Sequence, residues 1–359
     1  MNIIKKYLNR VFIDGLSGMA LGLFATLIIG TVIVQLGDFA AKFINEPVGN
    51  FIIVIGKSAS ALTGAGIGVG VAYKFKESPL VVVSAAVCGM IGAFATKILA
   101  GTVFANGVVT FAGPGEPLGA FIAAYVGIEI GHLISGKTKL DILLTPLVSI
   151  FAGSAAGLLV GPTISSLMNS LGNLINWGTE QQPFIMGIVV SVLMGVILTL
   201  PISSAALGII LNLNGIAAGA ATVGCAANMV GFAFASYKEN KIGGVFAQGL
   251  GTSMLQVPNI VKKPVIFFPA ILTSAVLGPV STCILKMTNN ATGSGMGTCG
   301  LVGQIMTYQT MSEAGIEFWI ILIEIALMHF ILPAFLSYYI SKAMRKLGWI
   351  KDGDMKLDL

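Results

Sequence analysis

The chain has few charged residues and almost no histidine. Aspartate, glutamate, lysine and arginine make up 10% of its 359 residues, and the sequence contains 2 histidines. A soluble domain normally carries about 25% charged residues, so this composition excludes an ordinary cytosolic enzyme or a nucleic-acid-binding protein. Apolar residues make up 55% of the chain, which excludes a disordered protein. A polytopic membrane protein remains.

Cysteine is scarce as well, and its spacing carries no metal-binding or redox motif. The residues are Cys88, Cys225, Cys283 and Cys299, all in apolar or glycine-rich surroundings. We predict that they are small core residues, with neither a disulfide framework nor a metal site. The sequence indicates no cofactor, and no pairing of a nucleophile with a base indicates a catalytic site.

Long apolar runs recur along the whole chain. A helix needs about 20 apolar residues to cross a bilayer, and the runs predict an all-α polytopic membrane protein of about nine or ten transmembrane helices. We expect a single transmembrane domain over 1–341 and a short cytoplasmic tail over 342–359. The predicted spans are 15–36, 51–73, 79–101, 117–136, 140–163, 184–204, 214–236, 264–287 and 317–341.

Residues 242–258 are too short and too interrupted by glycine to cross a bilayer securely. Lysines stand on both sides of this segment, at Lys238, Lys241, Lys262 and Lys263. Because lysine marks the cytoplasmic side, both ends of the segment should lie on that side. We therefore predict a re-entrant hairpin, which is tolerated only where protein or a polar cavity covers its backbone.

Two segments resemble one another. Residues 69–77 and 230–239 both begin with Val-Gly and end with an aromatic residue, lysine and glutamate close together. Internal repeats are common in transporters. A duplication and chance similarity between helices rich in small residues both account for the match.

Basic residues orient the spans. They precede the first run, follow the second, fourth and last runs, and are absent from the segments 102–114 and 164–183, which we take as external loops. By the positive-inside rule, both termini lie in the cytoplasm of a bacterial cell whose plasma membrane the chain crosses several times.

Two acidic positions stand out within the apolar sequence. Glu116 lies in Gly-Pro-Gly-Glu-Pro-Leu-Gly at residues 113–119, where glycine and proline break a helix. It is either a solvated turn residue or a carboxylate that accepts hydrogen bonds from solute hydroxyls. Glu129 and His132 share a helix face, and ionisable groups inside a membrane are usually functional. His132 is therefore a second candidate, unless it only marks the membrane boundary.

A series of neutral amides follows between residues 201 and 260. An amide offers both a donor and an acceptor, which suits an uncharged polyol, although amides also join helices within bundles. We take Asn212, Asn214 and Asn228 as candidates for substrate binding. The series consists of Asn212, Asn214, Asn228, Gln248, Gln256 and Asn259.

The span outline, the glutamate framed by proline and glycine at 113–119, the Gly-His pair at 131–132 and the Lys-Thr-Lys-Leu-Asp entry at 137–141 resemble a membrane IIC component of the bacterial phosphotransferase system. More narrowly, the chain resembles the stand-alone branch that includes perfringolysin-regulator-like proteins. The resemblance implies a homodimeric sugar carrier that works with separate IIB and IIA proteins, because the chain has no such domain of its own. It also implies that Glu116, in a Gly-x-x-Glu motif, holds the sugar.

Two functions stay open at this point. The first is alternating-access transport of a small sugar or related hydroxylated solute, within membrane lipid and without nucleic-acid partners. The second is a IIC-like membrane sensor or regulator that transports nothing. A membrane enzyme or an ion channel is less well supported, since neither a catalytic constellation nor a repeated filter motif is present.

The topology can be tested by cysteine labelling. We expect a cysteine introduced at Ser170 to react with a membrane-impermeant reagent added outside intact cells, and a cysteine at Ser78 to be protected. Labelling at position 78 from outside would contradict the predicted orientation.

Overall fold

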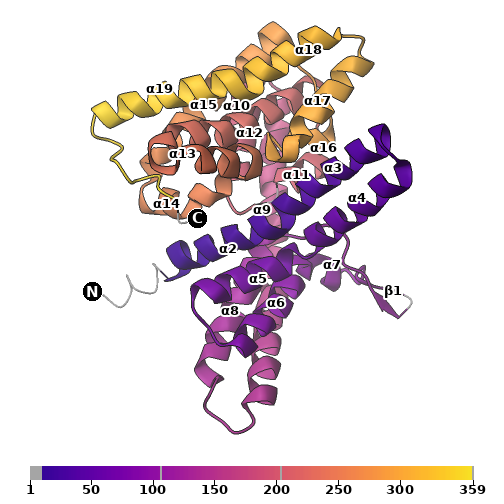
Figure 1. Cartoon of the computed structure of the whole chain (residues 1–359), viewed down its shortest axis with the longest axis vertical. Helices are drawn as coiled ribbons and strands as arrows, with labels where there is room; N and C mark the ends of the chain where they lie inside the picture. Colours follow the sequence, from indigo (N-terminus) through magenta and orange to yellow (C-terminus); the bar gives the residue numbers. More distant parts are fainter. Residues whose placement is uncertain (1–9, 106, 203, 358–359) are drawn as a thin grey trace. The chain divides into compact units, whose positions relative to one another are not determined.

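A computed structural model describes residues 10–105, 107–202 and 204–357. Helices make up nearly all of this part of the chain, which confirms the predicted all-α membrane fold. The chain divides into two compact units, Met1–Leu167 and Met168–Leu359, and Figure 1 shows their helices coloured along the sequence.

Unit 1 is built from helices, with one short pair of β-strands between α7 and α8 in the described residues. The strands β1 (Phe104–Ala105) and β2 (Val108–Val109) pair antiparallel in the segment before α8. The helices are η1 (Arg10–Gly15), α2 (Leu16–Leu23), η2 (Phe24–Ile28), α3 (Ile29–Phe43), α4 (Glu46–Ala61), α5 (Thr63–Lys74), α6 (Pro79–Ala93), α7 (Ala95–Leu99), α8 (Pro117–Ile134) and α9 (Asp141–Thr179), which continues into unit 2.

Unit 2 packs around α12, which contacts α10, α15 and α19, and Figure 1 shows these helices together. Several shorter elements interrupt the helical pattern between them. The elements are α10 (Pro183–Thr199), α11 (Ser204–Ile210), α12 (Gly215–Ala235), α13 (Tyr237–Phe246), η3 (Ala247–Gly251), η4 (Ser253–Gln256), α14 (Val257–Lys262), η5 (Pro264–Phe267), α15 (Phe268–Pro279), η6 (Val280–Leu285), α16 (Ala291–Ser294), η7 (Cys299–Leu301), α17 (Val302–Glu313), α18 (Phe318–Ile325), η8 (Ala326–Ile331) and α19 (Leu332–Lys346).

Within the described residues, 6 helices are long and apolar enough to cross a membrane, or 7 if the bent pair α4–α5 forms one span. The helices α6 and α10 are apolar but shorter. Together these elements overlap all the predicted runs. One expectation is wrong: residues 164–183 are largely helical, because α9 continues to Thr179. Apolar residues recur there every three or four positions, which is the period of a helix.

Glycines bring the helices of unit 1 into direct backbone contact. A Cβ atom added at Gly22 would lie 2.2 Å from the Gly66 carbonyl oxygen, and one at Gly68 would lie 2.0 Å from the Ala85 carbonyl oxygen. Any larger side chain would force α5 away from α2 and α6. Small residues therefore serve the close packing that is typical of membrane helices.

The cysteines follow this packing with one exception. Cys88, Cys225 and Cys299 are buried, as predicted, whereas Cys283 is exposed. It lies on η6, whose buried side consists of Ser281 and Thr282. The sequence alone did not reveal which side of this segment faces inward.

The segment 242–258 is broken as predicted, because Thr252 adopts an extended backbone between η3 and η4. One lysine on each side of the segment contacts the same C-terminal tail: Lys238 pairs with Asp352, and Lys263 pairs with Asp354. Both ends of the segment therefore lie on the same side of unit 2, as a re-entrant hairpin requires.

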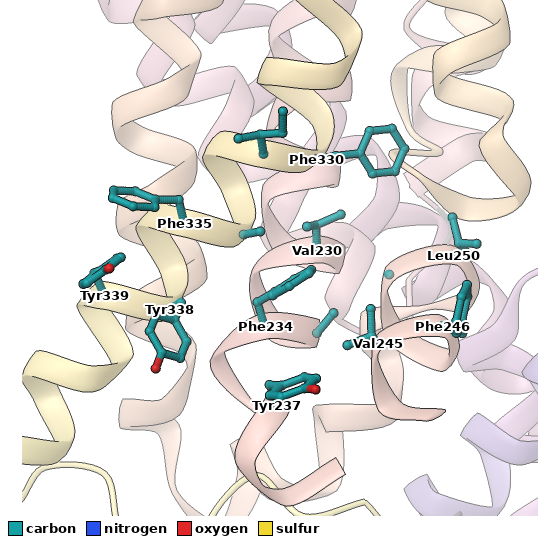
Figure 2. A pocket seen from close by; sticks show the side chains of 14 residues that line it. Val230, Phe234, Tyr237, Val245, Phe246, Leu250, Phe330, Phe335, Tyr338 and Tyr339 are labelled. Carbon is teal, nitrogen blue, oxygen red and sulfur yellow. The ribbon is translucent and has the colours of Figure 1, made fainter. Parts of the chain in front are cut away.

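A groove with a volume of about 810 Å³ opens between α12, the α13–η3 segment and the η8–α19 segment of unit 2. We call it the aromatic groove. Figure 2 shows Tyr237 and Tyr338 in its lower part, Tyr339 at its left side and Phe330 near its upper end. Its walls are apolar, so it does not suit a sugar.

The glycine contacts predict a large effect of one methyl group. Gly68→Ala should lower the free energy of unfolding by about 1–3 kcal/mol, the usual cost of overpacking, because the Ala85 carbonyl oxygen cannot move independently of α6. Gly243→Ala is the matched control, since no atom lies within 4 Å of its added Cβ. Thermal unfolding of purified protein measures both, and equal stability of the two variants would contradict the packing argument.

Candidate functional site

Glu116 stands at a backbone break immediately before α8. Gly113 and Gly115 have φ of +82° and +71°, which favours glycine, and a Cβ at Gly115 would lie 2.7 Å from that of Ala93. The Glu116 N–H donates to the Ala93 carbonyl oxygen at 2.8 Å. The side chain is half-buried at the positive end of the α8 dipole. The predicted break is present, and it holds a carboxylate at a helix N-terminus.

His132 belongs to a cluster of ion pairs at the opposite end of α8. Its Nδ1 lies 2.9 Å from a carboxylate oxygen of Glu77, a residue with only 4% of its side chain exposed. Arg10 joins Glu77 at 2.9 Å and Glu129 at 2.7 Å, and its guanidinium lies 4.1 Å from the centre of the Phe75 ring. Glu129 and His132 thus face one cluster, as their spacing predicted, and that cluster fastens three segments together.

Glu116 and His132 do not lie close together. Glu116 immediately precedes α8, and His132 lies in its last turn, sixteen residues further along. At the helical rise of about 1.5 Å per residue, about 24 Å separates them. A single small solute cannot contact both residues. Glu116 and His132 therefore cannot belong to one small-solute site in this structure.

The three candidate asparagines also occupy different environments in unit 2. Asn212 has a φ of +48°. Asn214 Nδ2 donates to the Oδ1 of Asn212 at 2.9 Å, in an exposed turn before α12. Asn228 is fully buried: its Nδ2 donates to Gly224 O and Ser274 Oγ, both at 3.0 Å, and its Oδ1 accepts from Thr199. Asn228 therefore joins helices, the alternative that the sequence left open.

The other amides of the series hold the C-terminal tail. Gln256 Nε2 donates to Gln248 Oε1 at 2.8 Å and to the Met355 carbonyl oxygen at 3.0 Å. Asn259 Nδ2 donates to Gln256 Oε1 and to the Lys356 carbonyl oxygen. Met355 is fully buried as a result. These amides recognise the backbone of the chain itself.

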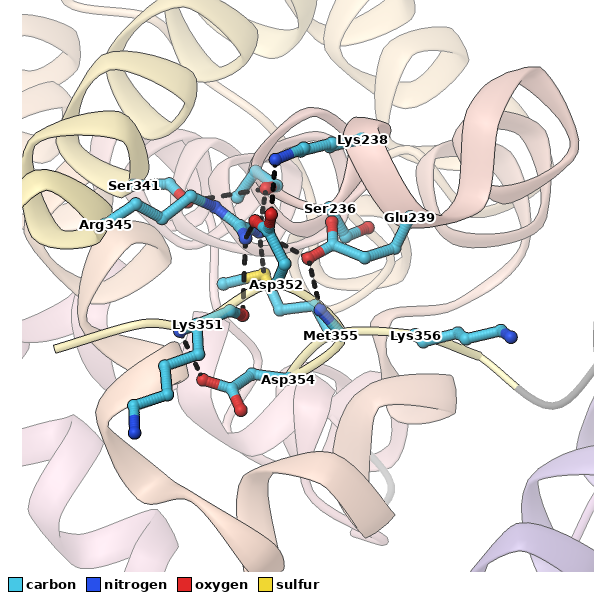
Figure 3. Close-up of polar contacts among 12 residues, drawn as sticks. Ser236, Lys238, Glu239, Ser341, Arg345, Lys351, Asp352, Asp354, Met355 and Lys356 are labelled. Atoms are coloured by element: carbon cyan, nitrogen blue, oxygen red, sulfur yellow. Dashed lines mark hydrogen bonds and ion pairs between the residues drawn. The ribbon is translucent and has the colours of Figure 1, made fainter. Parts of the chain in front are cut away.

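Ion pairs reinforce this docking, as Figure 3 shows. Arg345 pairs with Glu239 at 2.8 Å and with Asp352 at 3.3 Å, while Lys238 also pairs with Asp352. The hydrogen bond from Lys238 holds the pKa of the Asp352 carboxyl below its ordinary value. The tail therefore closes this end of unit 2 through charge as well as through amides.

The broken segment between η6 and α17 contains a buried polar network. Between η6 and α17 the backbone enters the left-handed region at Lys286, Gly297, Gly300 and Leu301. Asn289 exchanges two backbone hydrogen bonds with Gly215, at 2.9 and 3.1 Å. The glycine-rich stretch at 292–300 was the available sequence signal for this break.

The side chain of Asn289 holds this broken segment in place. It is fully buried, and its Nδ2 lies 2.7 Å from Thr222 Oγ1, 2.9 Å from Thr307 Oγ1 and 3.1 Å from the Gly303 carbonyl oxygen. One amide thus ties the segment to α12 and α17. Nonhelical backbone of this kind is tolerated at membrane depth only where the protein covers it or a cavity is present.

A buried amide–imidazole pair lies on α17 and η8. Gln304 Nε2 is 3.0 Å from His329 Nδ1, and these residues are 7% and 1% exposed. Because the amide N–H can only donate, Nδ1 accepts and the ring proton lies on Nε2. Within the described part of the chain, Gln304 Oε1 is buried without a hydrogen-bond partner. The pair therefore offers one acceptor and one donor.

Apolar spans, helices broken by left-handed backbone, and buried amides at the breaks define the class of polytopic α-helical membrane transporters. Residues 13–357 match the model of the phosphotransferase system EIIC family, and the chain belongs to that family. It thus has the general role of that system's membrane component in sugar transport. No curated protein sequence matches the chain.

The docked tail should loosen in acid. Burial raises the pKa of Asp354, but hydrogen bonds from the Lys263 ammonium and the Lys351 N–H outweigh it, so the pKa lies below the ordinary 3.8. The ionised carboxylate therefore stabilises the fold above about pH 4, and this contribution is lost as the pH falls through the lowered value. We expect Asp354→Asn to cost up to about 1 kcal/mol near pH 7 and nothing near pH 2. Thermal unfolding against pH measures this, and a pH-independent difference would contradict it.

Proposed function

We propose that this EIIC-family protein carries a small sugar or related hydroxylated solute by alternating access, and that Gln304 and His329 form part of its binding site. The observation that carries the proposal is the buried Gln304 Oε1, which no described residue satisfies. A buried acceptor without a partner costs about 1–3 kcal/mol. A solute hydroxyl can donate to this oxygen and accept from His329 Nε2–H, which would remove that cost.

The surrounding backbone supports this proposal. Transporters commonly bind their substrates where helices are discontinuous, near the middle of the membrane. The segment that Asn289 holds is discontinuous in this way, and α17, which carries Gln304, begins where it ends. A site at such a break can change shape when one half-helix moves relative to the other.

Glu116, in unit 1, is a separate candidate contact that the Gly-x-x-Glu motif supports. A carboxylate accepts stronger hydrogen bonds than a neutral amide, and the break before α8 keeps it at a helix end. His132 and Asn228 suit the solute less well, because protein groups already engage them. Asn212 and Asn214 bond mainly to one another in an exposed turn.

We further propose that the protein works as a homodimer in the bacterial cell membrane, with both termini cytoplasmic, and receives phosphate through separate IIB and IIA proteins. The family resemblance and the distribution of lysines support this arrangement, and the narrower placement in the perfringolysin-regulator-like branch rests on resemblance alone. A monomeric mass in lipid nanodiscs would count against the dimer.

Thermal-shift screening against sugars, sugar acids and polyols should identify a stabilising ligand, because a ligand that binds only the folded state raises its stability. With that ligand, Gln304→Leu should weaken binding by about 0.5–1.5 kcal/mol, and Glu116→Gln by about 1.5–3 kcal/mol. Gln304→Leu removes the unpartnered Oε1 but leaves the buried His329 Nδ1 without its donor, so its two effects on the stability of the unliganded protein oppose each other.

The matched control is Gln309→Leu, an exposed position on the same helix α17. It should bind the ligand like the parent. Parental affinity in Gln304→Leu would overturn the Gln304–His329 site, and parental affinity in Glu116→Gln would overturn Glu116 as a contact.

A further inference from the structure

The aromatic groove has walls that suit hydrocarbon. Aromatic and aliphatic side chains line it, and several remain substantially exposed: Phe335 is 56%, Ile331 55% and Phe246 59% exposed. An apolar concavity this large is unusual on a protein surface unless something covers it. In a membrane protein, acyl chains are the apolar molecules always present at such a face.

The groove is as long as one membrane leaflet. Along the η8–α19 segment it extends from Phe330 to Tyr339, nine residues or about 13 Å at the helical rise. The hydrocarbon core of a bilayer is about 30 Å thick, so one leaflet occupies about 15 Å. A membrane-spanning helix of a second copy would need a complementary face over both leaflets, whereas a single acyl chain needs only this length.

One end of the groove has the chemistry of a membrane interface. Figure 2 shows Tyr237 and Tyr338 in the lower part of the groove, and the Tyr339 ring lies 5.4 Å from that of Tyr338. Tyrosine prefers the level of lipid headgroups. Lys342 Nζ lies 5.8 Å from the centre of the Tyr338 ring and 5.9 Å from that of Tyr339. A cation therefore lies next to the Tyr338 and Tyr339 rings.

Neighbouring charges leave Lys342 available for an anion. Lys238 pairs with Asp352, and Arg345 pairs with Glu239 and Asp352. Lys342 is exposed and forms no ion pair with any residue the structure describes. Its ammonium can therefore meet a phosphate at the level of the tyrosine hydroxyls.

We propose that the aromatic groove binds one acyl chain of an anionic phospholipid, with the lipid phosphate held by Lys342. The groove accounts for the chain, the tyrosines for the depth of the headgroup, and the lysine for its charge. This site is separate from the Gln304–His329 pair and does not depend on the transported solute.

The experiment uses the purified, delipidated full chain and two lipids with identical acyl chains, phosphatidylglycerol and phosphatidylcholine. Native mass spectrometry counts retained lipid, and thermal unfolding gives the affinity of each. We expect phosphatidylglycerol to bind more tightly. Lys342→Gln should weaken phosphatidylglycerol binding about fivefold, the effect of one lysine near a membrane surface, and leave phosphatidylcholine unchanged.

Two further variants test the groove itself. Ala334→Trp fills it from α19 and should abolish retention of both lipids, whereas Ala343→Trp lies on an exposed part of the same helix, outside the lining. The charge control is Lys262→Gln at the end of α14. Because Lys342→Gln alters only an exposed side chain, it remains informative if Ala334→Trp does not fold.

Equal preference for the two lipids in the parent, or an unchanged preference in Lys342→Gln, would overturn the proposal. So would a loss of dimeric mass in Ala334→Trp with lipid retention intact, since that result would make the groove a contact between copies. Loss of phosphatidylglycerol selectivity in Lys342→Gln alone, with Lys262→Gln behaving like the parent, would support it.

Discussion

Backbone polar groups in the apolar parts of this chain must find hydrogen-bond partners within the protein, and the rest of the structure depends on that constraint. Continuous helices meet it by themselves. Where helices break, neighbouring groups take over: the backbone of Asn289 pairs with that of Gly215, the Thr252 hydroxyl accepts from the Met254 N–H, and the Ser253 hydroxyl bonds that of Thr199. The amides follow the breaks because the breaks need them.

In unit 1, glycine allows helices to pack with their backbones in contact. Gly18 and Gly22 lie against Gly70 and Gly66, so α2 and α5 meet at their backbones. Lipid is as apolar as these helices, and contact between them therefore rests on close packing rather than on the hydrophobic effect. The glycines of residues 64–70 serve contacts inside the chain, and any interface with a second copy must use other surfaces.

The buried polar groups fall into two kinds with different meanings. Asn228 and Glu77 have their polar atoms engaged by the protein, and they hold segments in register. Gln304 keeps a buried oxygen that no described residue satisfies, at the point where a broken segment passes into α17. A family whose members move sugars needs donors and acceptors of the second kind, because groups that the fold has satisfied offer little to a solute.

The sequence by itself determined the class of the protein. Apolar runs and scarce charge were enough to predict the helical membrane fold and the positions of its apolar helices, because hydropathy and chain length act locally. The break at Glu116 was equally visible, since glycine and proline act on their own backbone. The shared face of Glu129 and His132 followed from helical spacing.

Only the tertiary structure decided which polar residues meet. Arg10 joins Glu77 across 67 residues, and Gln256 reaches the tail across 99. Such partners depend on how helices pack, and the local sequence holds no record of it. Asn228 therefore joins helices, and Gln256 and Asn259 hold the tail. Gln304 and His329, 25 residues apart, became a pair only once α17 and η8 packed together.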